Sequence, residues 1–185
     1  TLVMALGQAG SVLDAATGAA RWESKPGHPG YSAPVACTLG GKPGYVFFSG
    51  HAVNGVAADG KQLWSIPWKT QWDFNAADPV VVGTQMLVSS GNGVGSALFD
   101  LSGKEPREVW RNKDLRSQHA TPLVHDGAIY GYDDDKGLVC MELATGKVLW
   151  RDGRLSKGTV ILAGDRLILL GEKGDLMVAE PSKAA

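Results

Sequence analysis

The sequence predicts an all-β protein, an incomplete β-propeller built from four-stranded antiparallel blades. A phrase in which a glycine is followed by a tryptophan recurs about every 40 residues, and such a period is typical of propeller blades. The apolar runs between the copies are short and broken by turn residues, with 25 Gly and 9 Pro in 185 residues. This pattern excludes helical repeats of similar length, which need an apolar period of 3.6 residues over ten or more positions.

The phrase occurs four times, and its tryptophans are separated by 42, 46 and 40 residues. The third copy has an insertion between glycine and tryptophan, which explains the longer spacing. In each copy we expect the glycine to take a positive φ in a tight turn, and the tryptophan to lie on the outermost strand and pack against the next blade. The predicted structural pairs are Gly18 with Trp22, Gly60 with Trp64, Gly103 with Trp110, and Gly146 with Trp150.

The strand pattern is clearest in the fourth repeat. Alternating or apolar runs at 121–125, 128–132, 138–143 and 147–151 are separated by turn residues such as Asp126-Gly127 and Thr145-Gly146. The same pattern predicts complete blades at about 31–68, 76–112 and 119–153, with partial blades at about 1–25 and 157–180. We therefore expect about 18 strands within a single domain, 1–185, whose first blade lacks its opening strand and whose last lacks its closing strand.

Composition argues against several classes of function. The formal charge is −1 and the charges are interspersed, so no basic stripe is available for nucleic acid. No apolar run approaches the roughly 20 residues needed to cross a bilayer. The first residues form an apolar run without a preceding basic segment, which indicates a strand and not a signal peptide. Cys37 and Cys140 are too far apart for a recognisable disulfide framework or metal motif, so we expect free thiols.

The repeat resembles the pyrroloquinoline-quinone-like (PQQ-like) β-propeller family, whose blades end in the phrase seen at 59–64 and 145–150. It is most similar to uncharacterised bacterial propellers of this type, through 67–70, 75–81, 90–98 and 158–167. The resemblance implies a ring of seven or eight blades, so this chain would be a fragment of a larger exported bacterial protein, periplasmic or secreted. The family includes both quinone-dependent alcohol dehydrogenases and a non-catalytic scaffold lipoprotein of the outer-membrane assembly machinery.

No catalytic, cofactor-binding or metal-binding residues are predicted. A quinone dehydrogenase of this fold needs a calcium ion, a base and, in some members, an adjacent cysteine pair, which is missing here. The acidic run 133–137 lacks the ordered ligands of a calcium loop and is interpreted as a solvated turn. The glycine-rich run 91–95 precedes a strand and not a helix, so it is interpreted as an ordinary connection. The histidines lie in separate repeats, and we expect separate surface or turn positions for His28, His51, His119 and His125.

One connection stands out as a possible binding surface. The segment after Trp64 carries aromatic residues outside the repeating tryptophan set, Trp68, Trp72 and Phe74, with the charged residues Lys69 and Asp73 at their edges. These residues either form an apolar patch for a partner or simply cap the junction between two blades. The sequence therefore favours a non-catalytic scaffold or binding module with an unidentified protein or small-ligand partner. The alternatives are part of a quinone-dependent alcohol dehydrogenase, with PQQ and calcium, and the sensory or interaction domain of a larger receptor.

Overall fold

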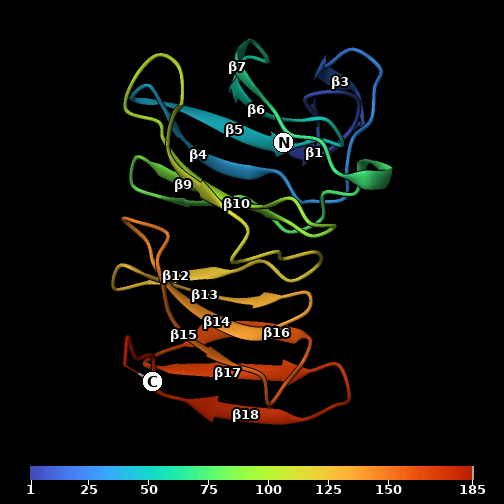
Figure 1. The fold of residues 1–185 in the computed structure, drawn as a ribbon. Helices are drawn as coiled ribbons and strands as arrows, with labels where there is room; N and C mark the ends of the chain where they lie inside the picture. The colour runs from blue at the N-terminus through green and yellow to red at the C-terminus, as the bar shows by residue number, and fades with distance from the viewer. Residues whose placement is uncertain (185) are drawn as a thin grey trace.

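The computed structural model describes residues 1–184 and contains five antiparallel sheets with 18 strands in chain order, as the sequence predicts. Three sheets have four strands, and the first and last have three. Figure 1 shows the sheets stacked face to face in chain order, from the blue N-terminal sheet to the red C-terminal one. The all-β propeller prediction is confirmed, including three complete and two partial blades.

Each sheet is a simple meander in which every strand pairs with the next strand along the chain. The first sheet contains β1 (Leu2–Met4), β2 (Ser11–Leu13) and β3 (Ala20–Glu23). The second contains β4 (Val35–Leu39), β5 (Lys42–Phe48), β6 (Ala52–Ala57) and β7 (Gln62–Pro67). The third contains β8 (Val80–Val82), β9 (Gln85–Ser90), β10 (Gly95–Asp100) and β11 (Arg107–Asn112).

The remaining strands continue this order. The fourth sheet contains β12 (Leu123–His125), β13 (Ala128–Asp133), β14 (Gly137–Glu142) and β15 (Val148–Asp152). The fifth contains β16 (Gly158–Ala163), β17 (Arg166–Gly171) and β18 (Leu176–Ala179). A single turn of 3₁₀ helix, η1 (Gln71–Asp73), interrupts the connection between β7 and β8. No helix among residues 1–184 is long and apolar enough to cross a membrane.

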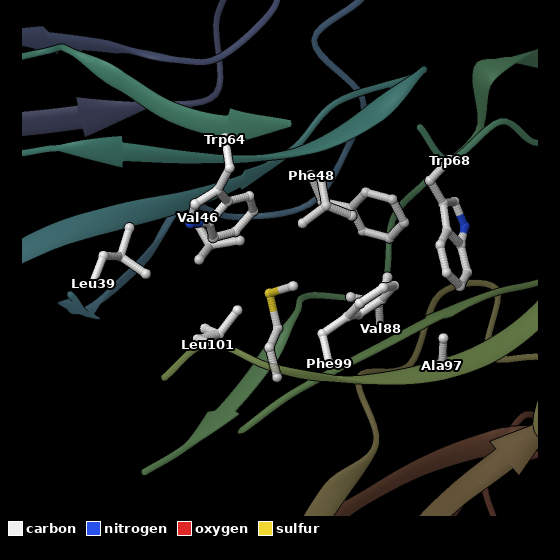
Figure 2. Packing of buried hydrophobic residues seen from close by; sticks show 11 residues of the cluster. Leu39, Val46, Phe48, Trp64, Trp68, Val88, Ala97, Phe99 and Leu101 are labelled. Carbon is white, nitrogen blue, oxygen red and sulfur yellow. The ribbon is translucent and has the colours of Figure 1, made fainter. Parts of the chain in front are cut away.

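Alternate residues of the middle strands face opposite neighbours, because successive side chains of a strand point to opposite faces of its sheet. In β9, Met86 and Val88 pack toward the second sheet, whereas Leu87 packs toward the fourth. Figure 2 shows Phe48 and Trp64 of the second sheet facing Phe99 and Leu101 of the third. The core is therefore a series of separate layers, one at each seam between sheets.

All four repeat tryptophans lie on the last strand of their sheet, and each follows a β-bulge. The residue before the tryptophan is the extra residue in every case, so the bulge changes the direction of the tryptophan side chain at the same position of each last strand. In the third repeat the pairing of Trp110 with Leu98 is preserved. The inserted residues are therefore absorbed by the turn before β11. The residues paired with the tryptophans are Val12, Gly55, Leu98 and Cys140.

The tryptophans do not all contact the next sheet in the same way. A Cβ on Gly60 would lie 2.5 Å from the Trp22 ring, and a Cβ on Gly146 would lie 2.7 Å from the Trp110 ring. The Trp110 indole N–H also donates to the Leu143 carbonyl oxygen, 2.8 Å away. These rings thus lie against the glycine turn of the following sheet.

The other two pairs depart from this arrangement. Trp64 is buried in the seam between the second and third sheets, but Gly103 has no tryptophan within 4 Å of its Cβ position and no positive φ. The longer turn has moved that glycine away from the seam. Trp150 lies in the seam between the fourth and fifth sheets, and its N–H donates to the Ser182 carbonyl oxygen at 2.9 Å.

Candidate binding face

The blade-to-blade connections and the turns between the second and third strands of the complete blades meet on one face, here called the connection face. It comprises residues 24–34, 49–51, 68–79, 91–94, 113–122 and 134–136. Backbone hydrogen bonds join these segments: Gly50 N–H donates to the His28 carbonyl oxygen at 2.8 Å, and Tyr31 N–H donates to that of Asn75 at 2.8 Å. Segments distant in sequence are thereby tied into one surface.

A buried polar network supports this face from below. The Asn75 side chain is fully buried, and its amide donates to the carbonyl oxygens of Ser49 and Gly50 at 2.9 and 3.2 Å. Its own carbonyl oxygen accepts a hydrogen bond from the Ser90 hydroxyl at 2.8 Å. The Ser90 oxygen also accepts the Trp68 indole N–H at 3.0 Å, so the polar side chains of Asn75, Ser90 and Trp68 are all hydrogen-bonded and hold the 49–51 turn in place.

Trp68 is a correction to the predicted binding surface. It is only 3% exposed and packs against Phe48 in the core layer shown in Figure 2, with the Arg111 guanidinium 4.4 Å from its ring centroid. Its indole N–H is already used by Ser90. The residue is buried because its backbone N–H, which donates to the His51 carbonyl oxygen at 2.9 Å, continues the pairing of β6 with β7, and its ring lies in the cluster between the second and third sheets. Trp68 therefore anchors the connection and is not available to a partner.

The rest of the predicted patch reaches the surface. Trp72 is 82% exposed and Lys69 is exposed. Phe74 is half-buried between Tyr31 and His119, with ring centroids 4.7 and 5.2 Å away. Tyr31 is itself 68% exposed, so aromatic side chains from three connections share this part of the face. In Figure 1 the short coil that carries Trp72 stands out to one side of the stacked sheets.

Asp73 is placed beside two histidines that the sequence analysis treated as separate. His28 Nδ1 lies 3.2 Å from one Asp73 oxygen, and His51 Nε2 lies 2.8 Å from the other. The two imidazole rings are tilted over one another with centroids 4.4 Å apart. His119 and His125 lie outside this group. No sequence spacing indicated the group, because its members come from three loops that meet only when the sheets stack.

The acidic run 133–137 also differs from a fully solvated turn. Asp133 is completely buried and accepts hydrogen bonds from the Arg116 side chain at 2.7 and 3.0 Å and from its backbone N–H at 3.0 Å. Burial by itself would raise the pKa of Asp133, but the hydrogen bonds and charge of Arg116 outweigh it, and the pKa lies below its ordinary value. Asp135 is exposed and pairs with the same guanidinium at 2.8 Å. The carboxylates thus fasten the connection after β11 to the β13–β14 turn.

Neither cysteine has the properties of a reactive thiolate. Both are free in the described chain, and burial raises the pKa of Cys37 to about 11 and also raises that of Cys140 above its ordinary value. Both are therefore protonated thiols near neutral pH.

The metal-ligating side chains that come together do not form the oxygen-rich set of the calcium ion that accompanies a quinone. Within residues 1–184, the one group of three metal-ligating side chains close enough to share an ion is His28, His51 and Asp73. Calcium takes six to eight oxygen ligands, and two of these three donors are imidazole nitrogens.

Known structures share the fold at low sequence identity. BamB from Moraxella catarrhalis matches with a TM-score of 0.71 and 18% identity, over 97% of this chain and 63% of that one. The computationally designed proteins Ika8 and Ika4 match with TM-scores of 0.68 and 0.64 at 15% and 10% identity. The matches cover 95% of this chain and 53% of Ika8, and 82% of this chain and 92% of Ika4. The chain therefore spans less than two thirds of the BamB structure.

A search of curated proteins finds no match. A family model, in contrast, matches nearly the whole chain in two overlapping passes, over residues 1–152 and 55–183, and it is described as outer membrane protein assembly factor BamB. Together with the recurring glycine and tryptophan turns and the stacked four-stranded sheets, this match shows that the chain belongs to the BamB-like family of PQQ-like β-propellers.

Proposed function

We propose that the chain is a non-catalytic binding module of an exported bacterial protein, and that its connection face holds a protein partner during outer-membrane protein assembly. The family description supports a role in outer-membrane protein assembly, and the exposed Trp72 supports a partner contact on the connection face. Trp72 is 82% exposed, and the same connection carries Phe74 against the exposed Tyr31; exposed aromatic side chains of this kind are the anchors that dominate protein interfaces. The proposed compartment is the periplasm, on the outer-membrane side.

The observation that carries the proposal is the contrast between Trp68 and Trp72. Both belong to one short connection, yet Trp68 is buried and hydrogen-bonded whereas Trp72 points into solvent. Trp72 has a φ of 66°, a left-handed conformation that is uncommon for a bulky residue. The fold thus holds a large apolar side chain away from the core, and a binding surface explains this better than packing does.

Site-specific photo-crosslinking in the native host tests the location. We expect a crosslinker at position 72 of the full-length protein to capture a defined envelope protein that belongs to the outer-membrane assembly apparatus. Lys61 is the control position, because it lies in the β6–β7 turn and outside the connection face. Equal products at positions 61 and 72, or none at position 72, would contradict the proposal.

A second experiment separates this function from that of a quinone enzyme. The full-length protein is mixed with pyrroloquinoline quinone and Ca²⁺, and dye-linked alcohol oxidation is measured. We expect no oxidation above that of quinone alone. Alcohol-dependent dye reduction that requires the protein would replace the binding-module proposal with the dehydrogenase.

A further inference from the structure

We propose that His28, His51 and Asp73 bind a divalent transition-metal ion of the zinc type, with at least one coordination position left open. The site lies on the connection face beside Trp72 and does not depend on the proposed partner. Its donors are one ring nitrogen each of His28 and His51 and an Asp73 carboxylate oxygen, which all lie within 4.8 Å of one another. Two imidazoles and one carboxylate are a set that zinc accepts in proteins.

The distances between the donors already approach those of a metal polyhedron. Ligand atoms about 2.0–2.1 Å from a tetrahedral zinc ion are on the order of 3.4 Å from each other. The carboxylate of Asp73 lies 3.2 Å from His28 Nδ1 and 2.8 Å from His51 Nε2. The Asp73 carboxylate is therefore already near the ligand-to-ligand distance from both imidazoles.

The backbone holds the three donors in position without a metal. A Cβ on Gly50 would lie 2.9 Å from Asp73 Cβ and 3.0 Å from His28 Cβ. The Cβ atoms of both ligand residues therefore pack directly against this glycine. His51 follows directly in sequence, and its carbonyl oxygen accepts a hydrogen bond from Trp68 N–H at 2.9 Å. Because the buried Asn75 amide holds the carbonyls of the 49–51 turn, the ligands stand on a rigid base, as tight metal binding requires.

The backbone at Asp73 gives an independent reason to expect a ligand. Trp72 and Asp73 are consecutive non-glycine residues with φ values of 66° and 53°. Such conformations are energetically unfavourable for residues other than glycine and concentrate at functional sites. Here they turn the Asp73 carboxylate inward to both histidines while Trp72 points outward. The side chains of His28, His51 and Asp73 are 62%, 45% and 28% exposed, so an ion has access and water can complete the coordination.

Zinc titration of the untagged full chain tests the site. The protein is stripped with a chelator, and Zn²⁺ is then titrated in competition with a chromophoric chelator. We expect one equivalent to bind. Co²⁺ in place of Zn²⁺ should give the visible absorption of a four- or five-coordinate ion with nitrogen ligands. We expect His51→Ala and Asp73→Asn to weaken Zn²⁺ binding by at least about tenfold.

His125→Ala is the matched control, because His125 is also a partly exposed histidine, with Asp126 3.3 Å away, but lies outside the group. It should bind Zn²⁺ as tightly as the original chain. Thermal unfolding without metal checks that each variant is folded, and His28→Gln replaces any variant that is not. Binding that is equally weak in the original chain and in His51→Ala, or equally reduced by His125→Ala, would overturn the proposal.

Discussion

At the scale of single residues, the buried ion pair between Arg116 and Asp133 joins a connection to a strand of the fourth sheet. Asp133 is completely buried at the end of β13, and three hydrogen bonds from Arg116 satisfy it. A buried carboxylate is costly unless it is paired and hydrogen-bonded. The pair therefore makes the position of the 113–122 connection depend on the fourth sheet.

Removal of this carboxylate should be strongly destabilising. We expect Asp133→Ala to lower the free energy of unfolding by about 3 kcal/mol, because Arg116 would be left partly buried and without its main partner. Asp135→Ala removes an exposed carboxylate from the same guanidinium and should cost less than about 1 kcal/mol. Urea unfolding of both variants measures the difference, and equal losses would contradict the role assigned to burial.

The same pair predicts a dependence on pH. The pKa of Asp133 is lowered by folding, so its contribution to stability is fully present above the unfolded pKa and is lost as the pH falls through the folded pKa. The stability advantage of the original chain over Asp133→Asn should therefore be constant near neutrality and shrink below about pH 4. Urea unfolding across this pH range measures the difference in unfolding free energy between the two chains. A difference that grows as the pH falls would contradict a lowered pKa of Asp133.

At the scale of strands and turns, the recurring unit is a glycine turn, a bulge and a tryptophan. The bulge before each tryptophan is shared by all four repeats, whereas contact with the next glycine turn is seen for Trp22 and Trp110. The bulge is therefore a property of the single blade. The docking of the ring is a property of two neighbouring blades.

Glycine substitutions separate these two contributions. Gly18 and Gly60 occupy the same place in the phrase and have φ values of 72° and 90°, but only Gly60 has a tryptophan ring within 4 Å of its Cβ position. We expect Gly18→Ala to lower the unfolding free energy by about 1 kcal/mol through backbone strain alone. Gly60→Ala should cost about 1–3 kcal/mol more, because the Trp22 ring must move. Equal costs in thermal or urea unfolding would exclude ring docking as the reason for this glycine.

At the scale of the whole molecule, the seams between sheets differ in size. The apolar cluster at the seam between the first and second sheets contains three buried residues, Ala9, Phe47 and Val56, whereas the cluster between the second and third contains eleven. Because each repeat contacts only its neighbours, the local stability of a sheet depends on how many apolar residues are buried at its own seams. The connection face spans the better-packed seam, which suits a surface that must stay rigid.

This difference predicts a gradient of amide hydrogen exchange. Amides of β2 should exchange before those of β9, β10, β13 and β14, which lie between two core layers. Phe47→Ala should speed exchange in the first two sheets and leave β13 and β14 unchanged. Hydrogen exchange with mass spectrometry resolves these segments, and uniform protection would indicate one cooperative unit.

The number and order of the strands, the sheets they form and the positions of the repeat tryptophans could be predicted from the sequence alone. These features depend on short-range rules: alternation of apolar residues, glycine turns and a regular period. It also indicated that the connection after β7 is unusual. It did not distinguish Trp68 from Trp72, because both are aromatic residues in one loop and only the packing of β9 and β10 beneath decides which is buried.

Only the tertiary structure decided which side chains share a site. The group of His28, His51 and Asp73 joins three loops, and the pairing of Arg116 with Asp133 joins a connection to a distant turn. Such contacts depend on the angle between stacked sheets and on loop conformations such as the left-handed backbone at Asp73. No local pattern records these quantities, since the same loop sequence on differently stacked sheets would face different neighbours.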